Sequence, residues 1–202
     1  TGKRPLVHLG DLGVLGDHVV LAHAVHLDDD EVERVLATRT AIASCPWAYL
    51  RLAQGFIVAG RHDEVYLRGG RVAMGCDSEN AGDAVDILRA ATTFVGIFRD
   101  RAIDAYSLTA HDALALATIR GAEAVGKGDV IGSLEPGKHA DVVVHERRGA
   151  QFLPLSPEPV LQLMWASDGR SVNDVIVGGR EVIRDRRCVT VDIDALRAEA
   201  AA

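Results

Sequence analysis

The sequence of 202 residues is poor in aromatic side chains and in cysteine. Aromatic residues make up 4% of the chain, and there are three cysteines. Cys45, Cys76 and Cys188 form neither a CxxC pair nor an even set. This count argues against a disulfide framework and favours reduced thiols in a cytoplasmic protein.

Long apolar runs are also lacking. No stretch approaches the roughly 18 consecutive apolar residues that suggest a membrane-spanning helix. No basic N-terminus followed by an apolar core marks a signal peptide. We therefore expect no membrane association.

Basic residues are also fewer than acidic ones. The chain has 22 Lys and Arg against 29 Asp and Glu, and its formal net charge is −7. The charges are interspersed, so no basic stripe predicts a nucleic-acid partner. No GxxxxGK[ST] phosphate loop occurs either. The remaining composition, 48% hydrophobic and 25% charged, is ordinary for a globular protein of one large or two small domains.

Up to about Gly126, short apolar runs alternate with segments of helical periodicity. Such short, nearly continuous apolar runs are typical of strands that are buried on both faces. Their alternation with helices predicts an α/β fold with parallel strands and crossover helices. Three strands cannot close a barrel, so the sheet is either open or part of something larger. Strands are predicted at 18–25, 40–45 and 71–76, and helices at about 29–38, 83–98 and 110–125, the last with Thr109 as N-cap and Asp112 at the capping-box position.

After Gly126 the pattern changes to short strands and turns. One hairpin is predicted around Pro136 and Gly137, and a second around Gly178 and Gly179. A short helix at about 160–166 is expected between them, and another helix at the end of the chain. Residues 1–126 and 127–202 are thus predicted to form two portions of different architecture.

Two histidines stand at the end of the first predicted strand. His23 and His26 face opposite sides if the strand persists, so only one of them can point into a given site. His23 lies near the C-terminal end of the strand, where parallel α/β folds place their active sites. It is a candidate for metal or acid–base chemistry, with a satisfied core histidine as the alternative. His26 is expected at the surface or behind the site.

Asp77 follows the third predicted strand. A carboxylate directly after apolar residues is costly unless it is paired, metal-bound or solvated. The alternative is a turn or N-cap aspartate in a polar loop. Together with His23 at the same edge of the sheet, Asp77 suits metal binding or acid–base work on a metal-activated water.

Other conspicuous residues have simpler interpretations. The acids Asp28–Glu31 suggest a cation site, but at the start of a helix they stabilise the positive end of the helix dipole. Trp47, Tyr49 and Arg51 are expected in a loop, where they either line a pocket or pack locally. No sequence feature lowers the pKa of Cys45, which argues against a nucleophilic cysteine.

Several longer stretches carry a distinctive pattern. "LTAHDALALATIRGAEAVGKGDVIGSLEPGKHADVVV" contains TAxxALxxATxxGAxAxG followed by GSLEPGKxAD, and "VNDVIVGGR" contains VxxVIVxGR. These resemble the C-terminal part of the amidohydrolase superfamily, in its cytosine deaminase/chlorohydrolase-like branch. "LAHAVHLDDDE", "SCPWAYLRLAQG" and "VAMGCDSENAGDAVDIL" resemble the sixth, seventh and eighth barrel strands of that family.

The resemblance implies a (β/α)₈ TIM barrel with a small β-sandwich. Residues 1–126 would form the C-terminal portion of the barrel, strands six to eight, and residues 127–202 part of the sandwich with a terminal helix. By motif match, Asp77 ligates a zinc or iron ion and takes the proton of the attacking water. His23 contacts that water and the leaving group. His23, Trp47, Tyr49 and Glu79 are expected to contact the substrate.

The sequence also departs from the family pattern. It has neither the HxH pair of the first strand nor the HxxE of the fifth, and "TGKRPLVHL" resembles the helix after that fifth strand. We therefore expect the C-terminal half of a longer protein. With two protein ligands at most, the chain alone should be inactive and nearly free of metal. Tyr49 stands where the family has Asn, which leaves the substrate class open.

The expected activity is that of a metal-dependent hydrolase that acts on non-peptide C–N bonds, most simply deamination of a heterocyclic amine. Hydrolysis of a cyclic amide or imidazolone is the main alternative, and dechlorination of a triazine is a further one. A non-catalytic barrel used for binding or assembly, or a split enzyme completed by a second chain, also fits. The expected partners are a small heterocyclic substrate and other copies of the full-length protein in a homo-oligomer.

Overall fold

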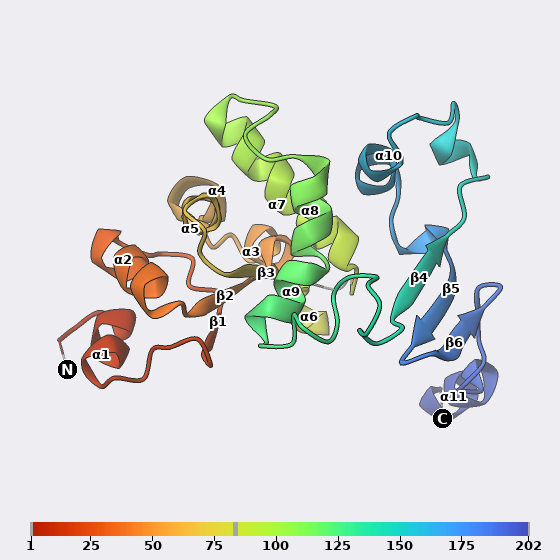
Figure 1. The fold of residues 1–202 in the computed structure, drawn as a ribbon, viewed down its shortest axis with the longest axis horizontal. Helices are drawn as coiled ribbons and strands as arrows, with labels where there is room; N and C mark the ends of the chain where they lie inside the picture. Colours follow the sequence, from red (N-terminus) through yellow and green to blue (C-terminus); the bar gives the residue numbers. More distant parts are fainter. Residues whose placement is uncertain (1, 83–84, 202) are drawn as a thin grey trace.

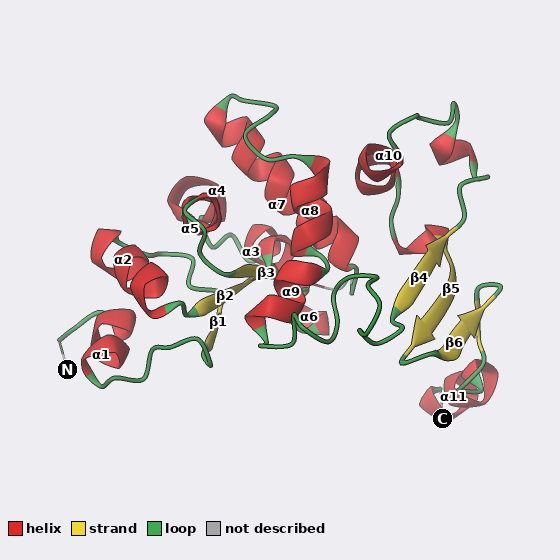
Figure 2. Ribbon diagram, viewed as in Figure 1, coloured by secondary structure: helices red, strands yellow, loops and turns green. Residues whose placement is uncertain are grey.

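The computed structural model describes residues 2–82 and 85–201. These residues form a parallel sheet of three strands surrounded by helices, and an antiparallel sheet of four strands near the C-terminus (Figures 1 and 2). The first sheet has the order β1-β2-β3 and the second the order β4-β5-β6-β7. The predicted change of architecture along the chain is therefore present, while the boundary at residue 126 stays a prediction.

The parallel sheet consists of β1 (Val20–Ala22), β2 (Ala41–Ser44) and β3 (Val72–Met74). All three strands are shorter than predicted at both ends. At the carboxyl end of β1 the backbone turns into the left-handed region at His23 and Ala24, which ends the strand. β2 and β3 are almost wholly buried, as their apolar runs indicate. β1 pairs with β2 only, and Val20 at its outer edge is 42% exposed.

Helices connect and cover these strands. α1 (Pro5–Asp11) precedes β1, and α2 (Asp29–Thr38) follows it as predicted. Asp28 and Glu31 form a capping box at the start of α2, and the buried Glu31 also pairs with Arg4 at 2.6 Å. The position of these acids at the start of a helix is as the sequence interpretation held. Each of the four acids also pairs with an arginine: Asp28 and Glu31 with Arg4, Asp29 with Arg61 and Asp30 with Arg34.

The segment between β2 and β3 is helical, where a loop was predicted. It contains α3 (Pro46–Arg51), α4 (Phe56–Ala59) and α5 (His62–Leu67). Pro46 occupies the first turn of α3, where its missing N–H costs nothing. The short lengths of these helices, and the glycines between them, hide their periodicity in the sequence.

Four helices come next after β3, and the last three of them contact the sheet (Figure 1). After α6 (Glu79–Gly82), α7 (Ile87–Ala102) begins at the cap Asp86. The predicted start of this helix at Asp83 and Ala84 lies outside the described residues. The helix predicted at 110–125 is two helices, α8 (Ala110–Leu116) and α9 (Ile119–Ala124), separated at Thr118 by a non-helical backbone. The capping box of Thr109 and Asp112 is confirmed.

The few aromatic side chains are concentrated in the core around α7. Phe94 and Phe98 pack at 4.7 Å between ring centroids, and Phe56 lies 5.2 Å from Phe98 and 4.8 Å from Tyr49. All four are almost completely buried. A continuous aromatic cluster therefore joins α7 to α3 and α4 and fixes the segment that follows β2.

The second sheet contains β4 (Val142–His145), β5 (Val172–Val177), β6 (Arg180–Arg184) and the short β7 (Arg187–Cys188). The hairpin at Gly178 and Gly179 is confirmed, and both glycines have the positive φ of a type I′ turn. The hairpin at Pro136 and Gly137 is wrong, because residues 127–141 contain turns and no strand. β4 instead pairs with β5.

Two further helices complete this part of the chain. α10 (Pro159–Ala166) lies where a helix was predicted and packs on α7 and α8, with Trp165 beneath Arg99 at 5.3 Å. α11 (Ile193–Ala200) is the predicted terminal helix. One sheet is present here, and its membership of a β-sandwich stays a prediction. None of the described helices has the length and apolar character needed to span a membrane.

Candidate metal-binding site at the ends of the parallel strands

The carboxyl ends of the three parallel strands each carry one residue with a metal-binding side chain. His23 follows β1, Cys45 follows β2 and Asp77 comes three residues after β3. Because the strands are parallel and adjacent, these ends lie at the same edge of the sheet.

The backbone at this edge has an unusual conformation. His23 and Asp77 have φ values of 69° and 63°, and Ala24 has 52°, in the left-handed region that residues with a side chain seldom adopt. The left-handed turn ends β1 after Ala22 and keeps His23 near β2, where its N–H donates to the carbonyl oxygen of Ala43 at 3.0 Å. Such conformations cost free energy and concentrate at functional sites.

His23 and Asp77 are brought together as predicted. Nε2 of His23 lies 3.7 Å from Oδ2 of Asp77, and the two side chains are 41% and 20% exposed. The other carboxylate oxygen of Asp77 accepts from the backbone N–H of Ser78 at 2.7 Å. The hydrogen bond from Ser78 therefore fixes the Asp77 carboxylate, while both side chains remain partly accessible to solvent.

Nδ1 of His23 is buried and has no hydrogen-bond partner within the described part of the chain. The ring of His23 packs against the edge of Tyr49, with centroids 5.6 Å apart. A buried imidazole nitrogen without a partner is costly, which is a reason to consider His23 for a ligand-binding role. The described residues satisfy only part of the ring, and the role of His23 in a site stays a prediction.

Cys45 is buried beside this pair. One donor atom from each of His23, Cys45 and Asp77 lies within 4.8 Å of the other two. Burial raises the pKa of the Cys45 thiol to about 11, and the charge of Asp77 adds to the rise. The thiol of the metal-free chain is thus protonated at neutral pH, which agrees with the expectation that Cys45 is no nucleophile.

A fully buried histidine, His62, supports the candidate site and was missed in the sequence. It begins α5, and its Nδ1 and Nε2 lie 2.9 Å from Oγ of Ser44 and 3.1 Å from the carbonyl oxygen of Ala24. Burial lowers its pKa to about 4, so His62 is neutral and donates to one partner while accepting from the other. It thereby fixes the turn that presents His23. Nothing in its sequence neighbourhood signals this role.

The residues expected to contact substrate do not all converge on the pair. Tyr49 is buried, and its hydroxyl donates to the carbonyl oxygen of Ala43 at 3.4 Å, so it supports the ring of His23 from the core. Trp47 lies under the guanidinium of Arg89 at 3.8 Å. Glu79 is exposed at the start of α6. Their substrate contacts stay a prediction.

His26 lies apart from the site. Its side chain is exposed, and its carbonyl oxygen accepts from Arg4. The expectation of a surface position for His26 is confirmed.

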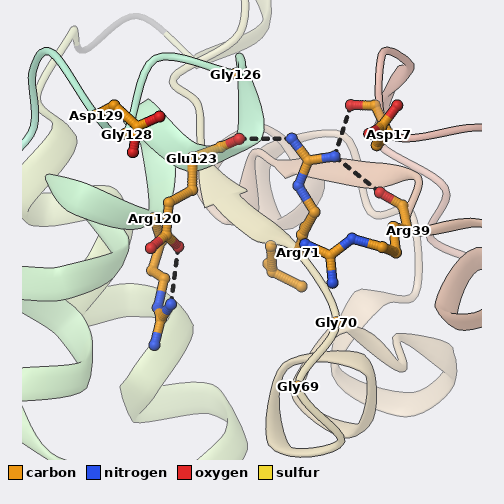
Figure 3. A pocket seen from close by; sticks show the side chains of 11 residues that line it. Asp17, Arg39, Gly69, Gly70, Arg71, Arg120, Glu123, Gly126, Gly128 and Asp129 are labelled. Atoms are coloured by element: carbon orange, nitrogen blue, oxygen red, sulfur yellow. Dashed lines mark hydrogen bonds and ion pairs between the residues drawn. The ribbon is translucent and has the colours of Figure 1, made fainter.

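The opposite end of the strands is closed by Arg71 (Figure 3). Its guanidinium donates to the carbonyl oxygens of Asp17 and Arg39 at 2.6 and 2.8 Å, and of Glu123 and Ala124 at 2.5 and 3.1 Å. Figure 3 shows this side chain reaching across the hollow between two parts of the chain. Because its guanidinium N–H groups donate to backbone carbonyl oxygens, Arg71 has a structural role. The candidate site is therefore at the other end of the sheet, where the carboxyl ends of the strands lie.

This fold defines an α/β protein in which three side chains that could bind a metal lie at the carboxyl ends of parallel strands. Residues 2–182 match the amidohydrolase family, and the chain belongs to that family. It is 35% identical over 99% of its length to a 5-methylthioadenosine/S-adenosylhomocysteine deaminase of Teredinibacter turnerae, of which it covers 44%.

Two solved structures share the fold. An adenosine deaminase from Xanthomonas campestris with bound zinc superposes with a TM-score of 0.93 at 30% identity, over 99% of this chain and 45% of that chain. An atrazine chlorohydrolase variant from Arthrobacter aurescens, complexed with zinc and atraton, gives 0.90 at 25% identity, over 99% and 44%. The chain thus spans less than half the length of these relatives.

Proposed function

We propose that this chain supplies the His23–Asp77 part of the active site of a metal-dependent aminohydrolase, which removes the amino group of a heterocyclic amine as ammonia. The observation that carries the proposal is the 3.7 Å approach of Nε2 of His23 to Oδ2 of Asp77 at the carboxyl edge of the parallel sheet. The deaminase relatives support the choice of reaction.

The donors at this edge fit a divalent metal. An imidazole, a carboxylate and a thiol lie within reach of one another, and Nδ1 of His23 is buried without a partner. These donor types are the ones that zinc prefers, and the zinc-containing neighbours support zinc over iron. When bound, the metal supplies a water molecule of lowered pKa that attacks the ring carbon bearing the amine.

The two residues divide the proton transfers between them. Asp77, 20% exposed and in front of His23, accepts the proton of the attacking water. His23 lies beside it and donates a hydrogen bond to the departing nitrogen, which leaves as ammonia. Their closeness lets a proton taken up by Asp77 reach the leaving group without crossing bulk solvent.

We further propose that the parallel sheet continues as a TIM barrel in the whole protein. The outer edge of β1 has no partner strand among the described residues, and Val20 on it is exposed. A parallel sheet buries both faces and both edges when it closes into a barrel. The strands missing from this chain are then the source of the HxH and HxxE ligands that its sequence lacks.

The test is an ammonia-release assay of the full-length gene product loaded with zinc. Adenosine, 5-methylthioadenosine and S-adenosylhomocysteine are the substrates to compare, with atrazine as the competing substrate. Stoichiometric ammonia from an adenine nucleoside is the expected result. Chloride from atrazine with no ammonia from any nucleoside would replace deamination by dechlorination, and no turnover at all would favour a binding or assembly module.

A further inference from the structure

The carboxylate of Asp86 connects two parts of the molecule. Its Oδ1 accepts from the backbone N–H of Arg89 at 3.1 Å and caps α7. Its Oδ2 accepts from the backbone N–H of Gly169 at 2.8 Å, 83 residues further along the chain. A helix cap needs only one oxygen, so the bond to Gly169 serves another purpose.

Gly169 belongs to a turn that is fixed to the second sheet. It begins the 3₁₀ turn Gly169–Ser171, which leads directly into β5. Ser171 is completely buried, and its Oγ lies 2.7 Å from Nδ1 of His145 on β4. Its carbonyl oxygen accepts from the N–H of Glu146 at 2.8 Å. Contacts with both β4 and β5 therefore hold the N–H donor in place.

On its other side, Asp86 contacts the segment that carries Asp77. The backbone N–H of Asp86 faces the thiol of Cys76, where it lowers a pKa that burial raises. Gly82, at the end of α6, also packs on Cys76, and a Cβ atom at position 82 would clash with the Cys76 carbonyl oxygen. Gly82 and Asp86 thus both hold Cys76, which directly precedes Asp77.

Asp77 requires such support because of its backbone conformation. Its φ of 63° lies in the left-handed region, which a residue with a side chain keeps only when the surrounding structure enforces it. The local hydrogen bond from Ser78 to the Asp77 carboxylate fixes the side chain relative to its own loop. It does not fix the loop relative to His23.

We propose that Asp86 is a positioning residue for Asp77. By binding Gly169 it attaches the loop after β3 to the second sheet, and so holds the Asp77 carboxylate beside His23. This role rests on the proposed function, in which Asp77 accepts the proton of the attacking water. Loss of the bond between Asp86 and Gly169 should therefore slow the chemical step more than it weakens substrate binding.

The test uses variants of the full-length protein that break this bond from either side. Asp86→Ser keeps a hydroxyl that can cap α7, but its single oxygen is then used by the cap. Gly169→Pro removes the N–H donor and leaves the carboxylate unchanged. Proline suits this position, because Gly169 begins a 3₁₀ turn and Asp168 before it has an extended backbone. The matched control is Asp192→Ser, since Asp192 caps α11 in the same way but lies at the other end of the chain.

Two readouts are taken on each protein. The first is hydrogen–deuterium exchange of residues 75–82, where the amides of Gly75, Ala81 and Gly82 are hydrogen-bonded. We expect their exchange to rise at least about tenfold in Asp86→Ser and in Gly169→Pro, and not in Asp192→Ser. The second is ammonia release at saturating zinc. We expect kcat to fall by about 10–100-fold in both variants, with KM within about twofold of the wild type.

The double variant Asp86→Ser/Gly169→Pro makes the test specific to this bond. It should lose no more activity than either single variant, because both changes remove the same interaction. Additive losses, or an equal loss in Asp192→Ser, would contradict the proposal. So would a raised KM at unchanged kcat.

Wild-type exchange and kcat in both single variants would reduce Asp86 to a helix cap. Circular dichroism establishes that each variant is folded, and if one is not, the other decides. A wild type that released no ammonia would count against the proposed reaction. The exchange of residues 75–82 would still decide, without turnover, whether Asp86 holds this segment.

Discussion

Nε2 of His23 lies 3.7 Å from Oδ2 of Asp77, although the two residues follow different strands of the parallel sheet. Cys45, at the end of the strand between them, lies within 4.8 Å of both. The candidate site thus depends on the alignment of three strand ends, each of which carries a different side chain that could bind a metal.

Removing the carboxylate of Asp77 should abolish activity in the full-length protein. Asp77→Asn keeps the shape of the side chain and its hydrogen bond to the N–H of Ser78, but the amide cannot take up the proton of the attacking water. We expect kcat for ammonia release to fall by about 10²–10⁴-fold, the usual contribution of a positioned general base.

The matched control for Asp77→Asn is His26→Gln, which alters an exposed side chain apart from the pair. It should leave kcat within about twofold of the wild type, since surface substitutions away from a site have small effects. Equal loss of activity in both variants, or retention in Asp77→Asn, would contradict the role given to Asp77.

Much of this site follows from the sequence, and the reasons for the exceptions are physical. His23 and Asp77 stand directly after apolar runs, and the carboxyl ends of parallel strands meet, so their pairing is predictable. His62 and Cys45 are different, because their importance depends on contacts with Ala24 and Asp77 that no local pattern encodes.

The same distinction holds for the fold. The helix α2, the capping box of Thr109 and Asp112 and the Gly178–Gly179 hairpin are local features, and all were predicted correctly. The helix predicted at 110–125 was wrong because its apolar stripe continues through the break at Thr118. The first predicted hairpin was wrong because a Pro–Gly turn specifies only a reversal of the chain. A strand also needs a partner strand, and the partner of β4 is β5.

The stability of the chain should fall as the pH is lowered from about 6.5 to about 4 because of His62. Its pKa is lowered to about 4 by burial, below the ordinary value of 6.5, so the unfolded chain binds a proton in this range while the folded chain does not. The stabilisation is therefore fully present above pH 6.5 and is lost as the pH falls towards 4. A shift of this size corresponds to about 3 kcal/mol.

Urea unfolding of wild type and His62→Gln between pH 4 and pH 8 measures this effect. The glutamine retains a donor and an acceptor for Ala24 and Ser44 but cannot titrate, so the variant should be less stable at pH 8 and show a flatter pH dependence. Parallel curves for the two proteins would mean that His62 contributes nothing to acid sensitivity.

Restoring the residue that the family pattern has at position 49 should destabilise this chain. Tyr49 is buried against Phe56 and His23, so Tyr49→Asn replaces a core aromatic ring with a smaller polar amide. We expect a loss of about 3–5 kcal/mol in the free energy of unfolding, from the cavity and the buried amide together. Urea unfolding provides the measurement.

Tyr49→Phe is the control for this substitution. It keeps the ring and removes only the hydroxyl, whose bond to the carbonyl oxygen of Ala43 is long at 3.4 Å. The expected cost is at most about 1 kcal/mol. If Tyr49→Asn proved as stable as Tyr49→Phe, position 49 would belong to an adaptable pocket wall, which was one of the two sequence interpretations, and not to the core.

Arg71 should be a main stabilising residue at the end of the sheet opposite the site. Its guanidinium binds the carbonyl oxygens of Glu123 and Ala124 at the C-terminal end of α9, and those of Asp17 and Arg39 across the hollow of Figure 3. Arg71→Met keeps the length of the aliphatic stem and leaves these carbonyls to water. We expect a loss of about 2–3 kcal/mol, since hydrogen bonds to a charged group contribute about 1.5–3 kcal/mol each and solvent offsets part of the loss.

Guanidinium chloride unfolding of Arg71→Met tests this, with Arg180→Met on the exposed strand β6 as the matched control. The control should change the free energy of unfolding by less than about 0.5 kcal/mol. Metal affinity of the full-length protein offers a second readout, because Arg71 lies at the far end of the strands: it should stay unchanged in Arg71→Met under conditions where the variant is folded. A lowered metal affinity in the folded variant would show that the two ends of the sheet are coupled, contrary to the purely structural role assigned to Arg71.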